Sequence, residues 1–155
     1  MPLTERLTDV DRIRFWKDKI PFRYEYTAGV AGEKFLRGLQ EGRIIASRCT
    51  RCGRKYVPAK SYCAECFMPI TRYGEVGPEG TIAALTESHV RFDGTTAARP
   101  RLVAFVTFRG ATGGIVHQVS GKDARIGSKV EPRFRAKKGR KGSLLDIEEF
   151  RVVRG

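Results

Sequence analysis

The sequence contains no cysteine outside one short stretch and no apolar run long enough to span a bilayer. All four cysteines of the 155-residue chain lie between residues 49 and 66. A membrane-spanning helix needs about 20 consecutive apolar residues, so we expect no membrane segment. The opening stretch MPLTERLTDVDRIRFW is charged throughout and lacks the apolar core of a signal peptide. These absences predict a soluble cytoplasmic protein, and in a reducing compartment clustered cysteines hold metal more often than they form disulfides.

Acidic residues are also scarce. The chain has 17 Asp and Glu against 30 Lys and Arg, which gives a formal net charge of +13. Four thiolates around one zinc ion would still leave it strongly basic. A basic protein attracts anions, and net charge alone leaves nucleic acid, a phosphorylated cofactor and an acidic partner protein open. Hydrophobic residues make up 41% of the chain, which excludes a disordered tail.

The N-terminal part, residues 1–42, has the pattern of two helices. Thr8 or Asp9 can cap the first helix, and Pro21 ends it. Its apolar residues at helical spacing are Ile13, Trp16 and Ile20. Residues 24–32 are predicted to form a loop or a short extended piece.

A second short helix is predicted after this loop. It carries Phe35, Leu36 and Leu39, and Gly42 is placed to stop it. The segment 12–39 has more aromatic surface than two short helices can bury between them, and such patches usually mark interfaces. Trp16 is expected to pack against the second helix or a partner. The predicted partner-binding residues are Trp16, Phe22, Tyr24 and Phe35.

Residues 43–73 carry the cysteines as two Cys-x-x-Cys pairs, Cys49 with Cys52 and Cys63 with Cys66. Two residues between thiolates let both sulfurs approach one ion, and four thiolates complete a tetrahedral shell without an open position for water. Gly53 permits the left-handed backbone in which such a turn often ends. The spacing predicts one structural Zn²⁺ per chain, and iron in a rubredoxin-like site stays open because tetrahedral sulfur binds either metal.

Residues 74–155 have the pattern of five strands separated by turns. The turn RGATGG, residues 109–114, is expected between the second and third strands. Five short strands with glycine punctuation favour a small barrel of the OB type. The fold class is therefore mostly β with N-terminal helices, a four-cysteine ribbon and a C-terminal barrel. The predicted strands lie within residues 80–92, 101–108, 115–120, 129–136 and 144–153.

This order of parts, and several local motifs, resemble the DUF35 family of OB-fold proteins with a rubredoxin-like zinc ribbon. The motifs are FLRGLQEGRIIASRCTRCGRKYVPAKSYCAEC, GTIAALTESHV, RLVAFVTF and IGSKVEPRF. The resemblance implies a non-catalytic accessory subunit in a hetero-oligomer with a thiolase-fold enzyme. The implied enzymes are acetyl-CoA acetyltransferase and hydroxymethylglutaryl-CoA synthase, and acyl-CoA is implied as a shared ligand.

The residues themselves offer no catalytic set. His89 and His117 lie in predicted strands without a nearby cysteine or an obvious serine partner. The basic stretch 133–142 is predicted to be a hairpin loop of the barrel, where CoA phosphates could meet cations. The candidate cofactor-binding residues are Lys137, Lys138, Arg140 and Lys141.

Single-stranded nucleic acid is the alternative ligand for such a barrel. OB folds with a basic face and aromatic strand residues bind single strands. The aromatic residues that could stack bases, or belong to the core instead, are Phe105, Phe108 and Phe134.

Overall fold

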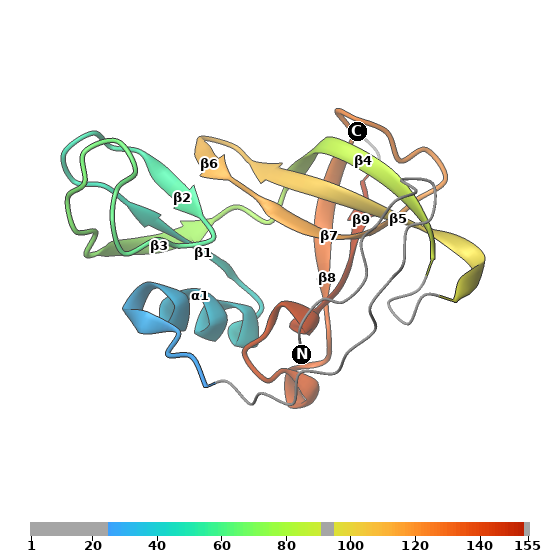
Figure 1. Cartoon of the computed structure of the whole chain (residues 1–155), viewed down its shortest axis with the longest axis horizontal. Helices are drawn as coiled ribbons and strands as arrows, with labels where there is room; N and C mark the ends of the chain where they lie inside the picture. The colour runs from blue at the N-terminus through green and yellow to red at the C-terminus, as the bar shows by residue number, and fades with distance from the viewer. Residues whose placement is uncertain (1–24, 91–94, 154–155) are drawn as a thin grey trace, which may run out of the picture.

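The computed structural model describes residues 25–90 and 95–153, which form one α-helix, two short 3₁₀ turns and two β-sheets (Figure 1). The predicted first helix, with Trp16, lies outside these residues, as do the predicted partner-binding residues Phe22 and Tyr24. Within the described residues, no helix has the length and apolar character needed to cross a membrane.

Helix α1, Gly29–Glu41, confirms the predicted second helix. It ends at Gly42, whose N–H donates to the carbonyl oxygens of Gly38 and Leu39. The prediction that residues 24–32 form a loop is wrong from Gly29 onward, because the buried face of the helix extends upstream to Ala31. That residue precedes Phe35 and Leu39 at intervals of four, so all three lie on one face.

Phe35 is only 4% exposed and packs within the core of its own chain. Its side chain therefore has no surface to offer a partner, and the prediction that it contacts one is corrected on this point. The spacing of Phe35, Leu36 and Leu39 therefore marks the face of the helix that packs on the core, not a face that binds a partner.

The first sheet contains four strands in the order β3-β1-β2-β6. Strand β1, Ile44–Arg48, pairs antiparallel with both β2, Lys55–Val57, and β3, Arg72–Val76. The fourth strand, β6, Ala111–Gly113, comes from the barrel half of the sequence and pairs parallel with β2. The predicted turn 109–114 therefore also contains a strand that joins the barrel to the cysteine region.

The second sheet is a closed barrel in the order β4-β5-β7-β9-β8. The first strand pairs with the fourth along the chain, and the third pairs parallel with the fifth. This confirms the predicted five-stranded OB-type barrel. Beyond the barrel wall, β4 and β5 continue as a two-stranded arm at the right of Figure 1. The strands are β4 Gly80–Val90, β5 Thr96–Phe108, β7 Ile115–Ser120, β8 Lys129–Phe134 and β9 Ile147–Val152.

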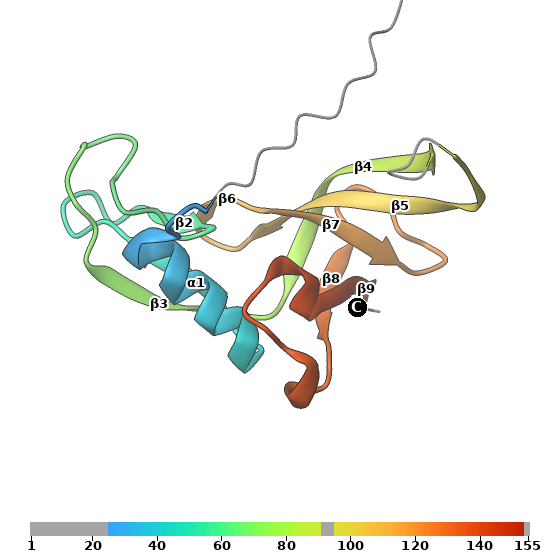
Figure 2. The same ribbon diagram turned by 60° about the horizontal axis from the view of Figure 1, so that its bottom comes forward.

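One hydrophobic core connects these parts. Leu39 of α1, Ile44 of β1 and Val57 of β2 belong to the same buried cluster as Val106 and Phe150 of the barrel. A second, smaller cluster lies further out, around two of the cysteines. Figure 2 shows α1 lying over the ribbon strands and beside the turns that connect β8 to β9. The predicted division of the chain into three domains at residues 42 and 73 stays a prediction. The shared core contains residues from all three parts.

Candidate metal centre and the adjoining groove

The fold brings the four cysteines together at the outer end of the first sheet. Cys49 directly follows β1, Cys52 lies in the turn before β2, and Cys63 and Cys66 lie in the loop before β3. Their Sγ atoms all lie within 4.8 Å of one another. Cys49 and Cys63 are buried, Cys66 is half-buried and Cys52 is exposed. This is the arrangement that one metal ion with four thiolate ligands requires.

The two Cys-x-x-Cys turns have matching backbone geometry. In the first turn, the N–H of Gly53 donates to the carbonyl of Cys49 at 3.0 Å. In the second, the N–H of Phe67 donates to the carbonyl of Cys63 at 3.0 Å. The N–H of Cys66 also points at the Sγ of Cys63, at 3.4 Å, and such contacts stabilise the charge of a thiolate.

Tyr56, at the centre of β2, is a component of the site that the sequence did not reveal. Its side chain is 1% exposed, and its hydroxyl lies 3.2 Å from the Sγ of Cys63 while accepting the N–H of Ala64. The ammonium of Lys60 lies over its ring. An aromatic residue in the middle of a short strand between two cysteine pairs was the only signal.

The thiols differ in acidity before any metal is bound. The hydrogen bond from Tyr56, opposed by burial, lowers the pKa of Cys63 to about 6. The neighbouring Cys52 thiol, together with burial, raises the pKa of Cys66 to about 12. The same Cys63 contact, together with burial, raises the pKa of the Tyr56 hydroxyl. Cys63 is therefore more ready than Cys66 to be a metal ligand, and metal binding would release the proton of Cys66.

The residues present fit a structural zinc ion. The donor set is four thiolates, two of them in a dry cluster with Tyr56 and Ile70. When bound, zinc would cross-link two loops that otherwise have little core. A shell of four protein ligands leaves no position for a substrate, so the chemistry of this site is structural.

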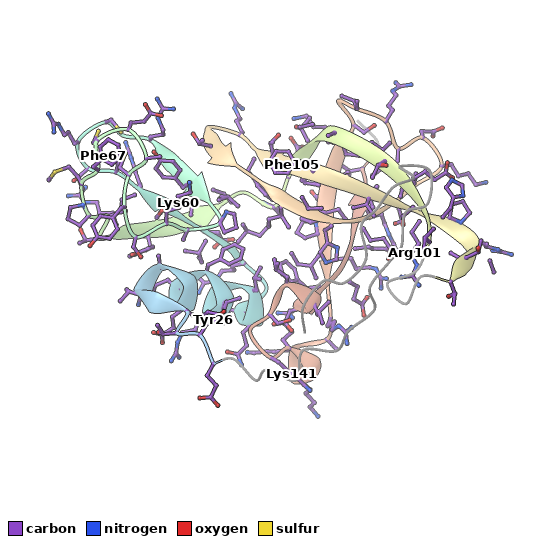
Figure 3. All side chains as sticks on the ribbon, in the orientation of Figure 1. Tyr26, Lys60, Phe67, Arg101, Phe105 and Lys141 are labelled. Carbon is purple, nitrogen blue, oxygen red and sulfur yellow. The ribbon has the colours of Figure 1, made fainter. Side chains whose placement is uncertain are left out.

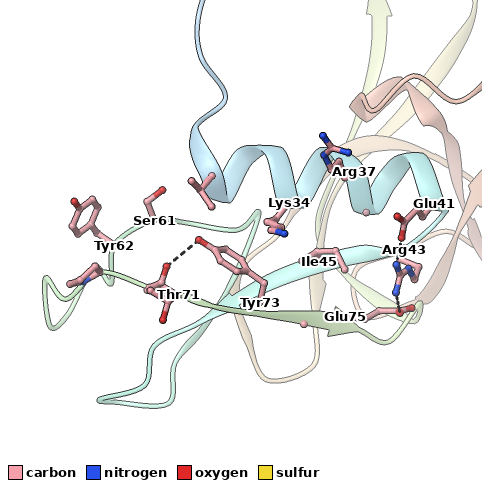
Figure 4. A pocket seen from close by; sticks show the side chains of 15 residues that line it. Lys34, Arg37, Glu41, Arg43, Ile45, Ser61, Tyr62, Thr71, Tyr73 and Glu75 are labelled. Carbon is pink, nitrogen blue, oxygen red and sulfur yellow. Dashed lines mark hydrogen bonds and ion pairs between the residues drawn. The ribbon is translucent and has the colours of Figure 1, made fainter.

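A groove of about 970 Å³ lies beside the ribbon, between α1 and strand β3 (Figure 4). One wall is a stripe along α1 that includes Val30, Lys34 and Arg37. The opposite side is formed by β1, β3 and the loop before β3, with Tyr62 at its outer end and Tyr73 near its centre. The sequence did not predict this groove, because its walls come from segments that are distant along the chain.

Charged side chains at the inner end of the groove neutralise one another. Arg43 pairs with Glu41 and lies 3.8 Å from Glu75. Its hydrogen bond and charge lower the pKa of Glu41, and Glu41 in turn raises the pKa of Arg43. Arg37 is paired with Glu33 at 2.7 Å. The groove therefore has no strong net charge that would select one ligand.

The four candidate cofactor-binding residues do lie together, in the connection between β8 and β9. Lys137, Lys138 and Lys141 are exposed, and Figure 3 shows Lys141 projecting below the molecule. Arg140 is different: it is half-buried, its Nε donates to the carbonyl of Arg135 at 2.7 Å and its guanidinium lies over the Phe134 ring. Only the three lysines are free to meet a ligand.

Asp146 holds this basic connection in place. It is 2% exposed, and its carboxylate accepts the backbone N–H groups of Lys141, Gly142 and Ser143 at 2.7–3.1 Å. Burial alone would raise the pKa of Asp146, but these hydrogen bonds outweigh it and lower the pKa below its ordinary value. Nothing in the amino-acid sequence indicates that this acid organises the lysines.

We expect Asp146→Asn to lower the free energy of unfolding at pH 7 by about 2 kcal/mol, because hydrogen bonds to a buried carboxylate are lost. Since the folded pKa is lowered, this stabilisation is full above about pH 4 and disappears as the pH falls through the folded pKa. Denaturant unfolding of both proteins from pH 7 to pH 2 measures it. Metal loss at acid pH affects both alike, and Glu131→Gln, at an exposed acid, is the control. A difference that does not shrink as the pH falls from 4 to 2 would contradict this role.

The other candidates have ordinary positions. His89 is exposed in β4, and His117 lies in β7 with its ring edge against Phe150. Phe108 is buried in the core, and Phe105 and Phe134 are half-buried. Among the described residues, no hydrogen bond joins a serine or a cysteine to a histidine. The barrel's aromatic residues are thus mostly withdrawn from the surface.

Comparisons with known proteins agree with this architecture. Residues 37–68 match the model of the ChsH2 rubredoxin-like zinc ribbon domain. No curated protein matches the chain. A solved structure from Sulfolobus solfataricus, described as a DUF35 family protein of unknown function, is 32% identical with a TM-score of 0.68. That match covers 84% of this chain and 90% of the other.

A second solved structure, described as the Ltp2-ChsH2(DUF35) aldolase, is 18% identical with a TM-score of 0.57. It covers 77% of this chain and 91% of the other, and at this identity it supports the fold alone. The Sulfolobus protein shares sequence and fold over nearly the whole of both chains. With its zinc ribbon and OB-type barrel in the same order, this chain belongs to the DUF35 family.

Proposed function

We propose that the protein is a non-catalytic accessory subunit that binds a thiolase-fold enzyme and contacts its acyl-CoA substrate. The observation that carries the proposal is the family membership, together with a second DUF35 chain, ChsH2, that is named with Ltp2 as an aldolase. In that structure a protein of this fold accompanies another chain in an enzyme. The thiolase-fold partner, of the acetyl-CoA acetyltransferase or hydroxymethylglutaryl-CoA synthase type, comes from the family resemblance.

The chemistry of the described residues supports a role without catalysis. The cysteines form a closed metal centre, and the two histidines lie in strands without a nucleophile beside them. What the surface offers instead is a groove and exposed cations. These features suit binding rather than bond making.

The contact with acyl-CoA is proposed for the exposed lysines of the β8–β9 connection. A CoA molecule carries a 3′-phosphate and a pyrophosphate, and lysine ammonium groups bind phosphate as point charges. Lys137, Lys138 and Lys141 are exposed on one short segment that Asp146 keeps ordered. Arg140 would contribute by holding the segment against Phe134 rather than by touching the ligand.

Single-stranded nucleic acid is the second candidate, because the barrel is OB-type and the chain carries a net charge of +13. The burial of Phe108 and the partial burial of Phe105 and Phe134 argue against it, since single-strand binders need exposed rings for base stacking. We therefore favour the accessory role.

Isolation of the native complex tests the proposal. The tagged chain, purified gently from its source organism, is expected to bring down a thiolase-fold enzyme in a fixed ratio, identified by mass spectrometry. In that complex, reversing the charge of Lys137 and Lys138 to glutamate should weaken CoA binding, more at low salt, and leave assembly unchanged. The matched control reverses Lys122 and Arg125, which are exposed elsewhere on the barrel.

Two results would contradict the accessory role. One is a native preparation that contains no enzyme chain. The other is retention of the purified protein on single-stranded DNA with an affinity that falls steeply as salt rises, which is typical of phosphate-backbone binding.

A further inference from the structure

The second cysteine turn differs from the first at one position. After Cys52 the first turn places Gly53, with φ of 73°, and after Cys66 the second places Phe67, with φ of 55°. Among the described residues, Phe67 is the only residue other than glycine with a positive φ. The left-handed conformation brings a Cβ close to the following carbonyl and is therefore unfavourable for phenylalanine.

Phe67 also gains nothing from packing. Its side chain is 81% exposed, and Figure 3 shows it at the end of the ribbon furthest from the barrel. The backbone conformation of Phe67 is strained, and its apolar ring is exposed to water. Phe67 therefore does not stabilise the folded chain. Local strain of this kind is concentrated at functional positions, so the observed geometry motivates a functional role.

Two further apolar side chains are exposed on the same loop as Phe67. Tyr62 is 64% exposed and Met68 is 44% exposed. Loop 62–69 is closed by a β-bridge between Tyr62 and Pro69 and by a 2.9 Å hydrogen bond from the N–H of Cys63 to the carbonyl of Met68. The metal centre lies inside this loop, so the three side chains are presented on a rigid base. We call Tyr62, Phe67 and Met68 the ribbon tip.

The ribbon that carries this tip is rich in cations. Arg48, Arg51 and Lys60 are exposed and have no ion-pair partner among the described residues, whereas the one nearby acid, Glu65, is paired with Arg54 at 3.4 Å. An exposed apolar loop on a basic ribbon is complementary to an apolar pocket beside acidic side chains. A single-stranded nucleic acid could use the same cations and stack a base on Phe67, and retention on single-stranded DNA, the result that contradicts the accessory role, would favour that occupant instead.

We infer that the ribbon tip is the surface that holds the enzyme subunit, with Phe67 inserted into an apolar pocket that acidic side chains border. The inference rests on the proposed accessory function and adds the residue and the kind of surface through which it acts. It also explains why the second turn has phenylalanine where glycine would suit the backbone better. Large side chains at the centre of an interface commonly account for most of its affinity.

Phe67→Asn separates binding from folding, because asparagine tolerates the left-handed conformation. The melting temperature of this variant should be unchanged or raised by roughly 2–4 °C, with the same metal content. Its dissociation constant for the purified enzyme subunit from the native complex should rise about thirty-fold, the size expected for a central anchor. Phe67→Tyr, which keeps the ring, should bind nearly as the parent does.

The control is Ile126→Asn, which removes another largely exposed apolar side chain, 66% exposed, from the barrel. The affinity of this variant for the enzyme subunit should equal that of the parent. If Phe67→Asn binds as tightly as the parent, the inference is overturned while the accessory function stands. If the variant loses metal or melts several degrees lower, Phe67 is structural and the inference is also overturned. If no enzyme subunit accompanies the native protein, the proposed function and this inference both fail.

Discussion

Cys63→Ser is expected to abolish stoichiometric metal binding and unfold the outer part of the ribbon. Cys63 is the most connected of the four cysteines: it contacts Tyr56, Cys52 and the N–H of Cys66. The cluster around it contains only Cys49, Tyr56 and Ile70 as other buried residues, too little core to fold without a cross-link. In small domains that depend on it, structural zinc contributes roughly 10 kcal/mol or more of folding free energy.

Elemental analysis and hydrogen exchange measure this result. The parent should contain about one zinc ion per chain, and the variant should contain little and should lose amide protection at residues 49–70. Protection in β5 and β7 should persist, because those strands have their own buried residues, such as Val106 and Val119. Ala64→Ser, which adds the same side chain at an exposed neighbour, should change neither. Full metal content in the Cys63 variant would show that this thiol is not a ligand.

The second large effect is expected at Gly113, where the barrel contributes β6 to the ribbon sheet. A Cβ at this position would lie 2.3 Å from the carbonyl oxygen of Val57, and φ is 88°. Neither the backbone of β2 nor the left-handed conformation can accommodate alanine without a shift. Gly113→Ala should therefore lower the free energy of unfolding by about 3 kcal/mol and weaken the protection of β2 amides.

Gly110→Ala is the matched control for this prediction. Gly110 also has a positive φ, of 70°, but a Cβ there would meet nothing within 4 Å. Gly110→Ala should lower the free energy of unfolding by about 1 kcal/mol, because only the left-handed backbone conformation opposes it. The difference between the two variants in denaturant unfolding measures the close approach of β6 to β2. Equal losses would mean that this contact does not hold the ribbon to the barrel.

Features that depend on neighbours in the sequence were predicted from the sequence. The spacing of the four cysteines identifies the metal centre, because two residues between thiolates are enough to bring both sulfurs to one ion. Gly42 stops α1 where predicted. The five barrel strands also appear near their predicted positions, since alternating apolar residues and intervening turns are local signals. The start of α1 was missed because Gly29 and Gly32 have low helix propensity.

Features that depend on contacts between distant segments were not predictable. Nothing in residues 111–113 indicates that they pair parallel with residues 55–57, since each strand has only three residues. In the sequence, Asp146 does not differ from the other acidic residues. Only the fold brings the backbone N–H groups of residues 141–143 to its carboxylate. The groove likewise exists only because α1 lies across strands β1 and β3.

Phe67 belongs to a cysteine turn that the sequence predicts, but only the tertiary structure shows its conformation and exposure. The sequence by itself determined the metal ligands, the strands and the basic composition, because spacing and side-chain chemistry act over a few residues. The tertiary structure alone decided which cations remain free, which aromatic residues are buried and that Phe67 is exposed in a glycine-like conformation. Burial and backbone conformation depend on how distant segments pack together, and this packing decides which of the candidate side chains can reach another molecule.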